Sequence, residues 1–142
     1  FILLFFITLI LLNNNTTKNM TITGLPVSSW NNAACTPNGI VYLLQNSTYK
    51  LFKIDLSTLA VTSVTLTGIS DNASNAIWGD MVIDPRTGDL LCWYHPTSGG
   101  SPKGLYKINL ATNTLVHMGT DVQQTMGTLF FETSGKLYVS QG

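Results

Sequence analysis

The chain repeats one of its own phrases. Residues 51–58 read Leu-Phe-Lys-Ile-Asp-Leu-Ser-Thr, and residues 105–112 read Leu-Tyr-Lys-Ile-Asn-Leu-Ala-Thr, so the two copies start 54 residues apart (105 minus 51). Each copy has the composition of a β-strand followed by a polar turn. A strand-and-turn phrase that returns at this distance indicates that one supersecondary unit occurs more than once, with each unit burying its faces against its neighbours.

A second phrase, a polar turn followed by glycine and an apolar strand, occurs three times. Its glycines are Gly39, Gly88 and Gly135, which are 49 (88 minus 39) and 47 (135 minus 88) residues apart. The loop at residues 95–102 accounts for the difference between the offsets of 54 and 49 residues. We therefore predict one repeat with a single loop insertion, and units at about residues 30–69, 75–121 and 125–142.

Composition indicates the fold class. The chain carries no net charge, and only 10% of its 142 residues are charged. It has no basic stripe, which argues against a nucleic-acid partner. Thr, Asn, Ser, Val, Leu and Tyr are plentiful, as in strands joined by polar turns, and no segment has a capped 3.6-residue period. We expect an all-β fold made of antiparallel four-stranded units.

Apolar runs between turns place the strands. The expected strands are residues 20–23, 33–35, 40–44, 51–55, 60–66, 78–83, 90–94, 105–108, 114–118, 128–132 and 137–140. Strands 40–44 and 90–94 should be equivalent and should follow matching glycine turns. By alternation, Phe52 and Ile54, like Tyr106 and Ile108, should face the packed side of their sheets. Lys53 and Lys107 should then carry their charge toward solvent.

The phrases at residues 51–58, 84–90 and 105–112 resemble the degenerate repeats of secreted bacterial and lower-eukaryotic β-propellers of the YVTN, NHL and Kelch-like kind. The resemblance covers about residues 30–142. It implies about two and a half four-stranded blades, and it implies a tendency toward binding, but it carries no catalytic residues across. Since a closed propeller has at least four blades, the resemblance also implies a fragment of a longer protein.

Residues 1–12 are apolar apart from Thr8. This run is too short to cross a bilayer as a helix and has the length of the apolar part of a signal peptide. We expect a truncated secretion leader, with the outer end of a membrane anchor, or a buried strand or helix, as the alternatives. The polar segment 13–29 should be a linker with one short strand.

A secreted or cell-surface protein can carry glycans on Asn-x-Ser/Thr triplets in exposed loops. Chance also generates such triplets in a chain this rich in Asn and Thr. The candidate acceptors are Asn14, Asn15, Asn19, Asn46 and Asn72. The two cysteines, Cys35 and Cys92, do not occupy equivalent places in the repeat. We interpret both as small buried apolar residues rather than a disulfide.

The candidate ligand-binding residues are Trp78, Asp80 and Trp30. Trp78 and Asp80 start an inner strand, where side chains can face a ligand in the central channel, although aromatic residues also fill the space between sheets. Asp80, Asp84 and Asp89 are close enough in sequence to suggest a calcium site. Their turn and strand positions favour structural roles instead, so we predict no metal and no cofactor.

No catalytic motif is present, and this favours a non-catalytic binding or scaffold module with a protein or carbohydrate ligand. The glycine-rich loop 95–102 is either functional or a tolerated insertion. The alternative function is a structural subunit of an extracellular fibre or surface layer that self-associates through open strand edges. A third alternative is an enzyme whose catalytic residues lie outside these 142 residues. Contact with a membrane is expected only through residues 1–12.

Overall fold

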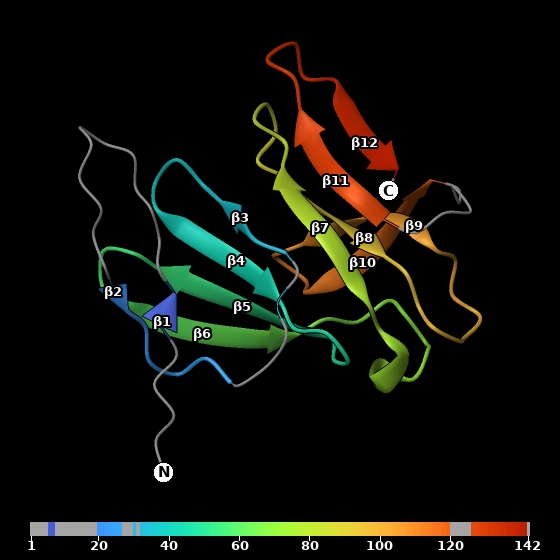
Figure 1. Ribbon diagram of the computed structural model, residues 1–142, viewed down its shortest axis with the longest axis horizontal. Helices are drawn as coiled ribbons and strands as arrows, with labels where there is room; N and C mark the ends of the chain where they lie inside the picture. The colour runs from blue at the N-terminus through green and yellow to red at the C-terminus, as the bar shows by residue number, and fades with distance from the viewer. Residues whose placement is uncertain (1–5, 8–19, 27–29, 31, 120–125, 142) are drawn as a thin grey trace.

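The computed structural model describes residues 6–7, 20–26, 30, 32–119 and 126–141, and these form almost only β-strands (Figure 1). The strands are β1 Phe6–Ile7, β2 Met20–Thr21, β3 Ala34–Cys35, β4 Ile40–Leu44, β5 Lys50–Asp55, β6 Ala60–Thr65, β7 Trp78–Ile83, β8 Leu90–Tyr94, β9 Gly104–Asn109, β10 Thr114–Gly119, β11 Met126–Phe131 and β12 Leu137–Gln141. One 3-10 turn, η1, covers Ala73–Asn75. No helix among these residues is long and apolar enough to span a membrane.

Two antiparallel four-stranded sheets have the same strand order. The first sheet is β3-β4-β5-β6, and the second, read in chain order, is β7-β8-β9-β10. Strands β11 and β12 form a hairpin that begins a third unit. The predicted all-β class and the common strand order are confirmed, and the strand bounds differ from the sequence prediction by at most two residues at either end.

In each of the three glycine turns the glycine N–H closes the turn by donating to a backbone carbonyl. Gly39 N–H donates to the Thr36 carbonyl (3.0 Å), and Gly135 N–H donates to the Glu132 carbonyl (2.8 Å). In the second unit Gly88 N–H donates to the Asp84 carbonyl (2.8 Å), because this turn is one residue longer. All three glycines have positive φ (81°, 74° and 82°), a conformation that side chains disfavour. The repeated glycine in the sequence therefore corresponds to a repeated turn in the structure.

The other repeated phrase ends in an Asx turn. The Asp55 carboxylate accepts the Ser57 N–H (2.8 Å), and the Asn109 side-chain oxygen accepts the Ala111 N–H (3.0 Å). These bonds are why a short polar side chain is required at this position. The last residue of each turn is left-handed, with Leu59 at φ 60° and Asn113 at φ 56°.

The same face of each sheet is turned toward the preceding part of the chain. Phe52 and Ile54 pack in one apolar cluster with Ile22 from the N-terminal segment. Their repeat equivalents, Tyr106 and Ile108, pack in a second cluster that lies between the two sheets. All four side chains are buried, as predicted. The first sheet thus contributes its other face, with Leu44 and Leu51, to the cluster between the sheets.

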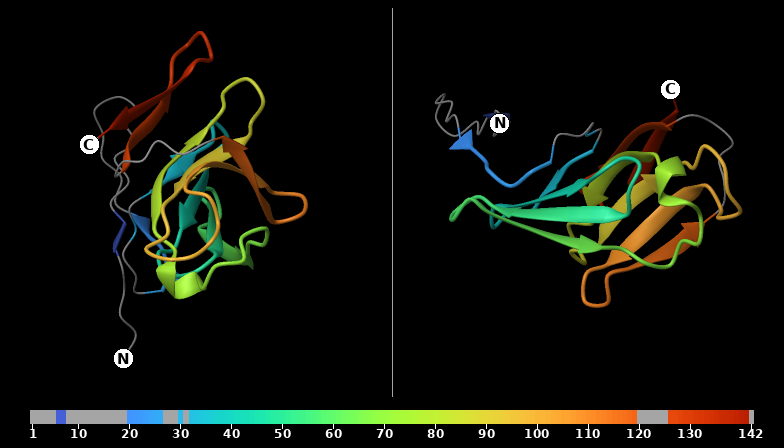
Figure 2. Two further views of the ribbon diagram at one scale, coloured as in Figure 1. Left: turned by 90° about the vertical axis from the view of Figure 1, so that its right-hand side faces the viewer. Right: turned by 90° about the horizontal axis from the view of Figure 1, so that it is seen from below.

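The first strand of each unit lies next to that of the following unit. Strand β7 contacts β3 on one side and β11 on the other, and Figure 1 shows β7 between them, with the β11–β12 hairpin on the side away from the first sheet. Seen from below, the two four-stranded sheets lie next to each other at an angle (Figure 2, right). The three units therefore follow one another in space in the same order as in the sequence.

The chain leaves the first sheet by crossing the edge of the second. Thr67 forms a parallel bridge with Thr114, in which Thr67 N–H donates to the Asn113 carbonyl and Leu115 N–H donates to the Thr67 carbonyl. Gly68 follows with φ 97°, and a Cβ atom there would lie 2.4 Å from the carbonyl oxygen of Leu115. Only glycine permits this close approach.

Only one of the two cysteines is buried. The prediction that both cysteines are buried is wrong for Cys35, which is exposed at the end of the short strand β3. Cys92 is fully buried, and neither cysteine forms a disulfide.

Of the apolar run 1–12, the described residues Phe6 and Ile7 pair with β2. The rest of the run lies outside the described residues, so the leader interpretation stays a prediction.

The cluster between the sheets predicts a large effect for Ile108→Ala. Ile108 is 2% exposed, so truncation leaves a cavity and should lower the free energy of unfolding by about 2–4 kcal/mol. Urea denaturation measures this. The control is Val116→Ala on the neighbouring strand β10, where the side chain is 48% exposed and the change should be within about 0.5 kcal/mol. Equal effects would contradict the packing.

The crossing predicts a matched pair of glycine substitutions. Gly68 and Gly88 both have positive φ, but a Cβ at Gly88 meets nothing within 4 Å. Gly88→Ala should therefore cost only the conformational penalty of about 1–2 kcal/mol. Gly68→Ala adds a backbone clash and should cost about 3 kcal/mol or more in total. Thermal and urea unfolding of both variants test this, and a Gly68→Ala cost no larger than that of Gly88→Ala would contradict the crossing geometry.

Candidate functional site

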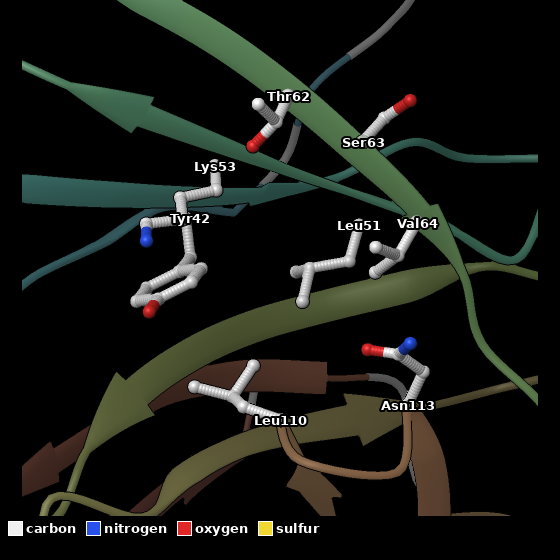
Figure 3. A pocket seen from close by; sticks show the side chains of 8 residues that line it. All are labelled: Tyr42, Leu51, Lys53, Thr62, Ser63, Val64, Leu110 and Asn113. Atoms are coloured by element: carbon white, nitrogen blue, oxygen red, sulfur yellow. The ribbon is translucent and has the colours of Figure 1, made fainter.

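A groove of about 150 Å³ opens between the first sheet and the turn after β9 (Figure 3). One wall is the face of the first sheet that is turned toward the second sheet. The other wall is the turn that carries Leu110 and Asn113. The lining residues are Tyr42, Leu51, Lys53, Thr62, Ser63, Val64, Leu110 and Asn113.

Strand register brings the polar side chains together. Tyr42, Lys53 and Thr62 are direct neighbours across β4, β5 and β6, so they point to the same face of the sheet. Figure 3 shows Tyr42 and Lys53 side by side on this face, above Leu110. The next row across β5 and β6, Leu51 and Val64, is apolar. The groove thus has a polar end and an apolar end.

Lys53 differs from its repeat equivalent in its surroundings. Lys107 donates to the Asp89 carboxylate at 2.7 Å, and this bond is the main cause that lowers the pKa of Asp89. In the first unit the position of Asp89 is taken by Ile40. Lys53 consequently forms no ion pair with any described residue. Lys53 does interact electrostatically with Asp55, two residues along the same strand. Because no carboxylate contacts its ammonium directly, Lys53 can still form a charge-assisted hydrogen bond with an anion.

Tyr42 contributes a neutral hydroxyl to the same end. Burial raises the pKa of Tyr42 above its ordinary value of 10.0, so the phenol keeps its proton at neutral pH and can donate a hydrogen bond. Thr62 and Asn113 add a hydroxyl and an amide. Together with Lys53 they form a set of hydrogen-bond donors around a small apolar floor.

The loop at residues 95–102 is held by a carboxylate. Asp71 accepts hydrogen bonds from Gly100 N–H (2.8 Å), Ser101 N–H (3.1 Å) and the Tyr94 hydroxyl (3.0 Å). The Tyr49 hydroxyl donates to the Asp71 carbonyl (2.9 Å). Burial raises the pKa of Tyr94, so its hydroxyl stays a donor. The insertion is therefore tied to the connection between the two sheets.

Trp78 is a core residue. It is fully buried, its indole N–H donates to the Thr48 carbonyl (2.8 Å), and its backbone N–H donates to the Asn46 side chain (3.0 Å). Its ring packs against Tyr49 and Tyr94. Trp78 therefore offers no surface to a ligand, in contrast to the expectation from the sequence.

The other two candidates are partly exposed and lie apart from the groove. Trp30 packs edge-on against Phe52, with ring centroids 5.4 Å apart, on the opposite face of the first sheet. The Asp80 carboxylate accepts the Leu129 N–H at 2.7 Å and so joins β7 to β11. The structure does not bring Trp30, Trp78 and Asp80 into one site.

The clustered aspartates hold turns and strands. Asp84 accepts the Arg86 N–H and forms an ion pair with its guanidinium (3.0 Å), while Asp89 pairs with Lys107. Among the described residues no group of His, Cys, Asp and Glu side chains is placed to hold a metal ion.

The glycan acceptors differ in environment. Asn46 is half-buried and accepts the Trp78 N–H, while Asn72 is exposed and caps η1. Asn14, Asn15 and Asn19 lie outside the described residues. An exposed acceptor is the accessible one, so Asn72 is the stronger glycosylation candidate of the two that are described.

Comparison with known proteins adds no identity: no family model matches the sequence, and no curated protein matches it. The groove residues Tyr42, Thr62 and Asn113, and the loop anchor Asp71, were not singled out from the sequence. The sequence does hold a signal for a fifth residue, Lys53, since aligning the two repeats places Ile40 opposite Asp89 and leaves Lys53 without the partner of Lys107.

The anchor of the loop predicts a pH dependence. Partial desolvation raises the pKa of Asp71. The hydrogen bonds from Ser101, Gly100 and Tyr94 lower this pKa, and their combined effect is larger, so the folded pKa lies below the ordinary 3.8. A lowered folded pKa stabilises the fold at higher pH, and this contribution is lost as pH falls through the folded value. The stability difference between the natural chain and Asp71→Asn should therefore be largest near neutral pH and shrink below about pH 4.

Urea unfolding at several pH values measures that difference, and hydrogen exchange at the Gly100 and Ser101 amides reports the loop itself. Faster exchange of these two amides in Asp71→Asn is expected at pH 7. A difference in stability that stays constant from pH 7 to pH 3, with unchanged exchange, would contradict the role of Asp71.

Proposed function

We propose that units 30–69, 75–121 and 125–142 are successive blades of a β-propeller-like stack, and that the chain serves as a non-catalytic binding or scaffold module at the cell surface or outside the cell. The observation that carries this proposal is the direction of packing. Phe52 and Ile54 face the N-terminal segment, and the equivalent Tyr106 and Ile108 face the first sheet. Blades stacked around an axis pack in this one-directional way.

The order of the inner strands supports the same proposal. Strands β3, β7 and β11 are neighbours in that order, and their turns are neighbours too, since Cys35–Pro37 and Asp84–Pro85 line one pocket and Gly135 lies against the Arg86 side chain. In a propeller the first strands of the blades surround the axis. The arrangement of the three units is consistent with an arc of such strands.

The third unit presents an apolar face in this arrangement. Phe130 and Tyr138 are direct partners in the β11–β12 hairpin, their rings stack with centroids 5.2 Å apart, and they are 50% and 42% exposed. In the repeat, Tyr138 corresponds to Tyr42, which is turned toward the next unit. This is the face on which a further blade would pack.

The alternative function is a subunit of a fibre or surface layer. Exposed Val116 and Met118 on β10 favour it, because β10 is the outer strand of the second sheet and unpaired strand edges with apolar side chains promote association. Strand pairing between copies would then replace ligand binding as the function.

The test is a screen of the purified 142-residue chain against immobilised glycans and peptides, run beside assays with chromogenic ester, glycoside and peptide substrates and with nicotinamide-linked oxidoreductase assays. The proposal predicts saturable binding without turnover. Catalytic turnover that survives repurification would contradict it. Regular filaments in electron micrographs, with no ligand found, would favour the fibre subunit instead.

A further inference from the structure

We propose that the groove defined by Tyr42, Lys53, Thr62, Val64, Leu110 and Asn113 is the ligand site, and that its ligand is a single sugar unit carrying a carboxylate. This inference rests on the proposed binding function and names the substrate class for it. It goes beyond that function because it identifies one groove as the site and infers the ligand from the charge, size and hydrogen-bond donors of that groove.

The charge of the groove selects an anion. Lys53 is the cation that lines it, and Lys53 has no ion pair among the described residues. Asp55, two residues along the same strand, accepts hydrogen bonds from Ser57 N–H (2.8 Å) and from the Ser57 hydroxyl. Its negative charge also interacts with Lys53, but it forms no ion pair with the ammonium. A carboxylate that enters the groove can therefore form a charge-assisted hydrogen bond with Lys53.

The size of the groove admits one ring. Its volume is about 150 Å³, and an apolar protein cavity of roughly 150 Å³ holds one benzene molecule. Leu51 and Val64 on the sheet and Leu110 on the facing turn supply an apolar surface, on which the C–H face of a sugar ring can pack. Thr62, Val64 and Leu110 in its lining are exposed, so a sugar within a longer chain can enter.

The remaining donors match hydroxyl groups. The Tyr42 hydroxyl, the Thr62 hydroxyl and the Asn113 amide surround the apolar floor, and no hydrogen bond joins any of these three side-chain groups to another described residue. Each can exchange a water molecule for a ligand hydroxyl. An amino acid or a simple carboxylate would satisfy Lys53 and would leave these three groups to water.

The experiment is a protein-observed NMR titration of the full chain with galacturonate, with neutral galactose and with glutarate as probes. Galacturonate should shift the amides of residues around Tyr42, Lys53 and Asn113 in a saturable way. Galactose has the same ring without the charge, and glutarate offers two carboxylates without the ring, so both should bind at least about tenfold more weakly than galacturonate.

A matched pair of variants assigns the charge. Lys53→Met removes the ammonium in the groove and should weaken galacturonate binding by about tenfold or more. Lys50→Met makes the same change on the same strand, but by alternation Lys50 points to the opposite face, so binding should be unchanged. Lys53→Arg keeps the charge and should retain binding, and a wild-type-like NMR spectrum of each variant establishes that it is folded.

The inference is overturned if galacturonate produces no saturable shifts, if galactose binds as tightly, if glutarate alone matches galacturonate, or if Lys50→Met and Lys53→Met weaken binding equally. A screen that finds a different ligand while galacturonate fails would overturn this inference and leave the binding-module proposal intact. Catalytic turnover would instead overturn the binding-module proposal.

Discussion

The structure depends on the packing of two β-sheets through an aromatic and aliphatic cluster that belongs to neither sheet alone. Trp78 is at its centre: its ring contacts Tyr49 of the first unit and Tyr94 of the second, and its two N–H groups donate to Asn46 and Thr48. A four-stranded meander exposes two faces, and burying large apolar side chains is the main favourable term in folding. Each sheet therefore gains stability from the neighbouring sheet that covers one of its faces.

The packing of one sheet on the next also forms the groove, because the groove lies between the first sheet and a turn of the second unit. The groove lies where β4, β5 and β6 of the first sheet face the turn after β9. Leu51 in this part of the sheet belongs to the core cluster, whereas an exposed position such as Lys53 can change without loss of the core. Lys53 and Lys107 occupy equivalent positions of the repeat. Lys107 forms an ion pair with Asp89, whereas Lys53 forms none with a described residue.

The sequence predicted the strands well because local chemistry determines them. Apolar runs bounded by Gly39, Gly88 and Gly135 leave few choices for the turns, and the all-β class and strand order followed. The site was not predicted, since alternation tells which residues share a face and not what covers that face. Trp78 was expected near a ligand and is core, and Cys35 was expected in the core and is exposed. Tyr42 and Lys53 meet only through the register of β4 and β5.

The central claim is that equivalent faces of the two four-stranded sheets point toward the preceding part of the chain. A NOESY spectrum of the folded chain tests it directly, because short proton–proton contacts identify which side chains share a cluster. The account predicts contacts between the rings of Trp78, Tyr49 and Tyr94, and contacts of the Phe52 ring with Trp30. Contacts of Phe52 or Ile54 with Tyr94 or Tyr106 would place the opposite face of the first sheet against the second, and would contradict the account.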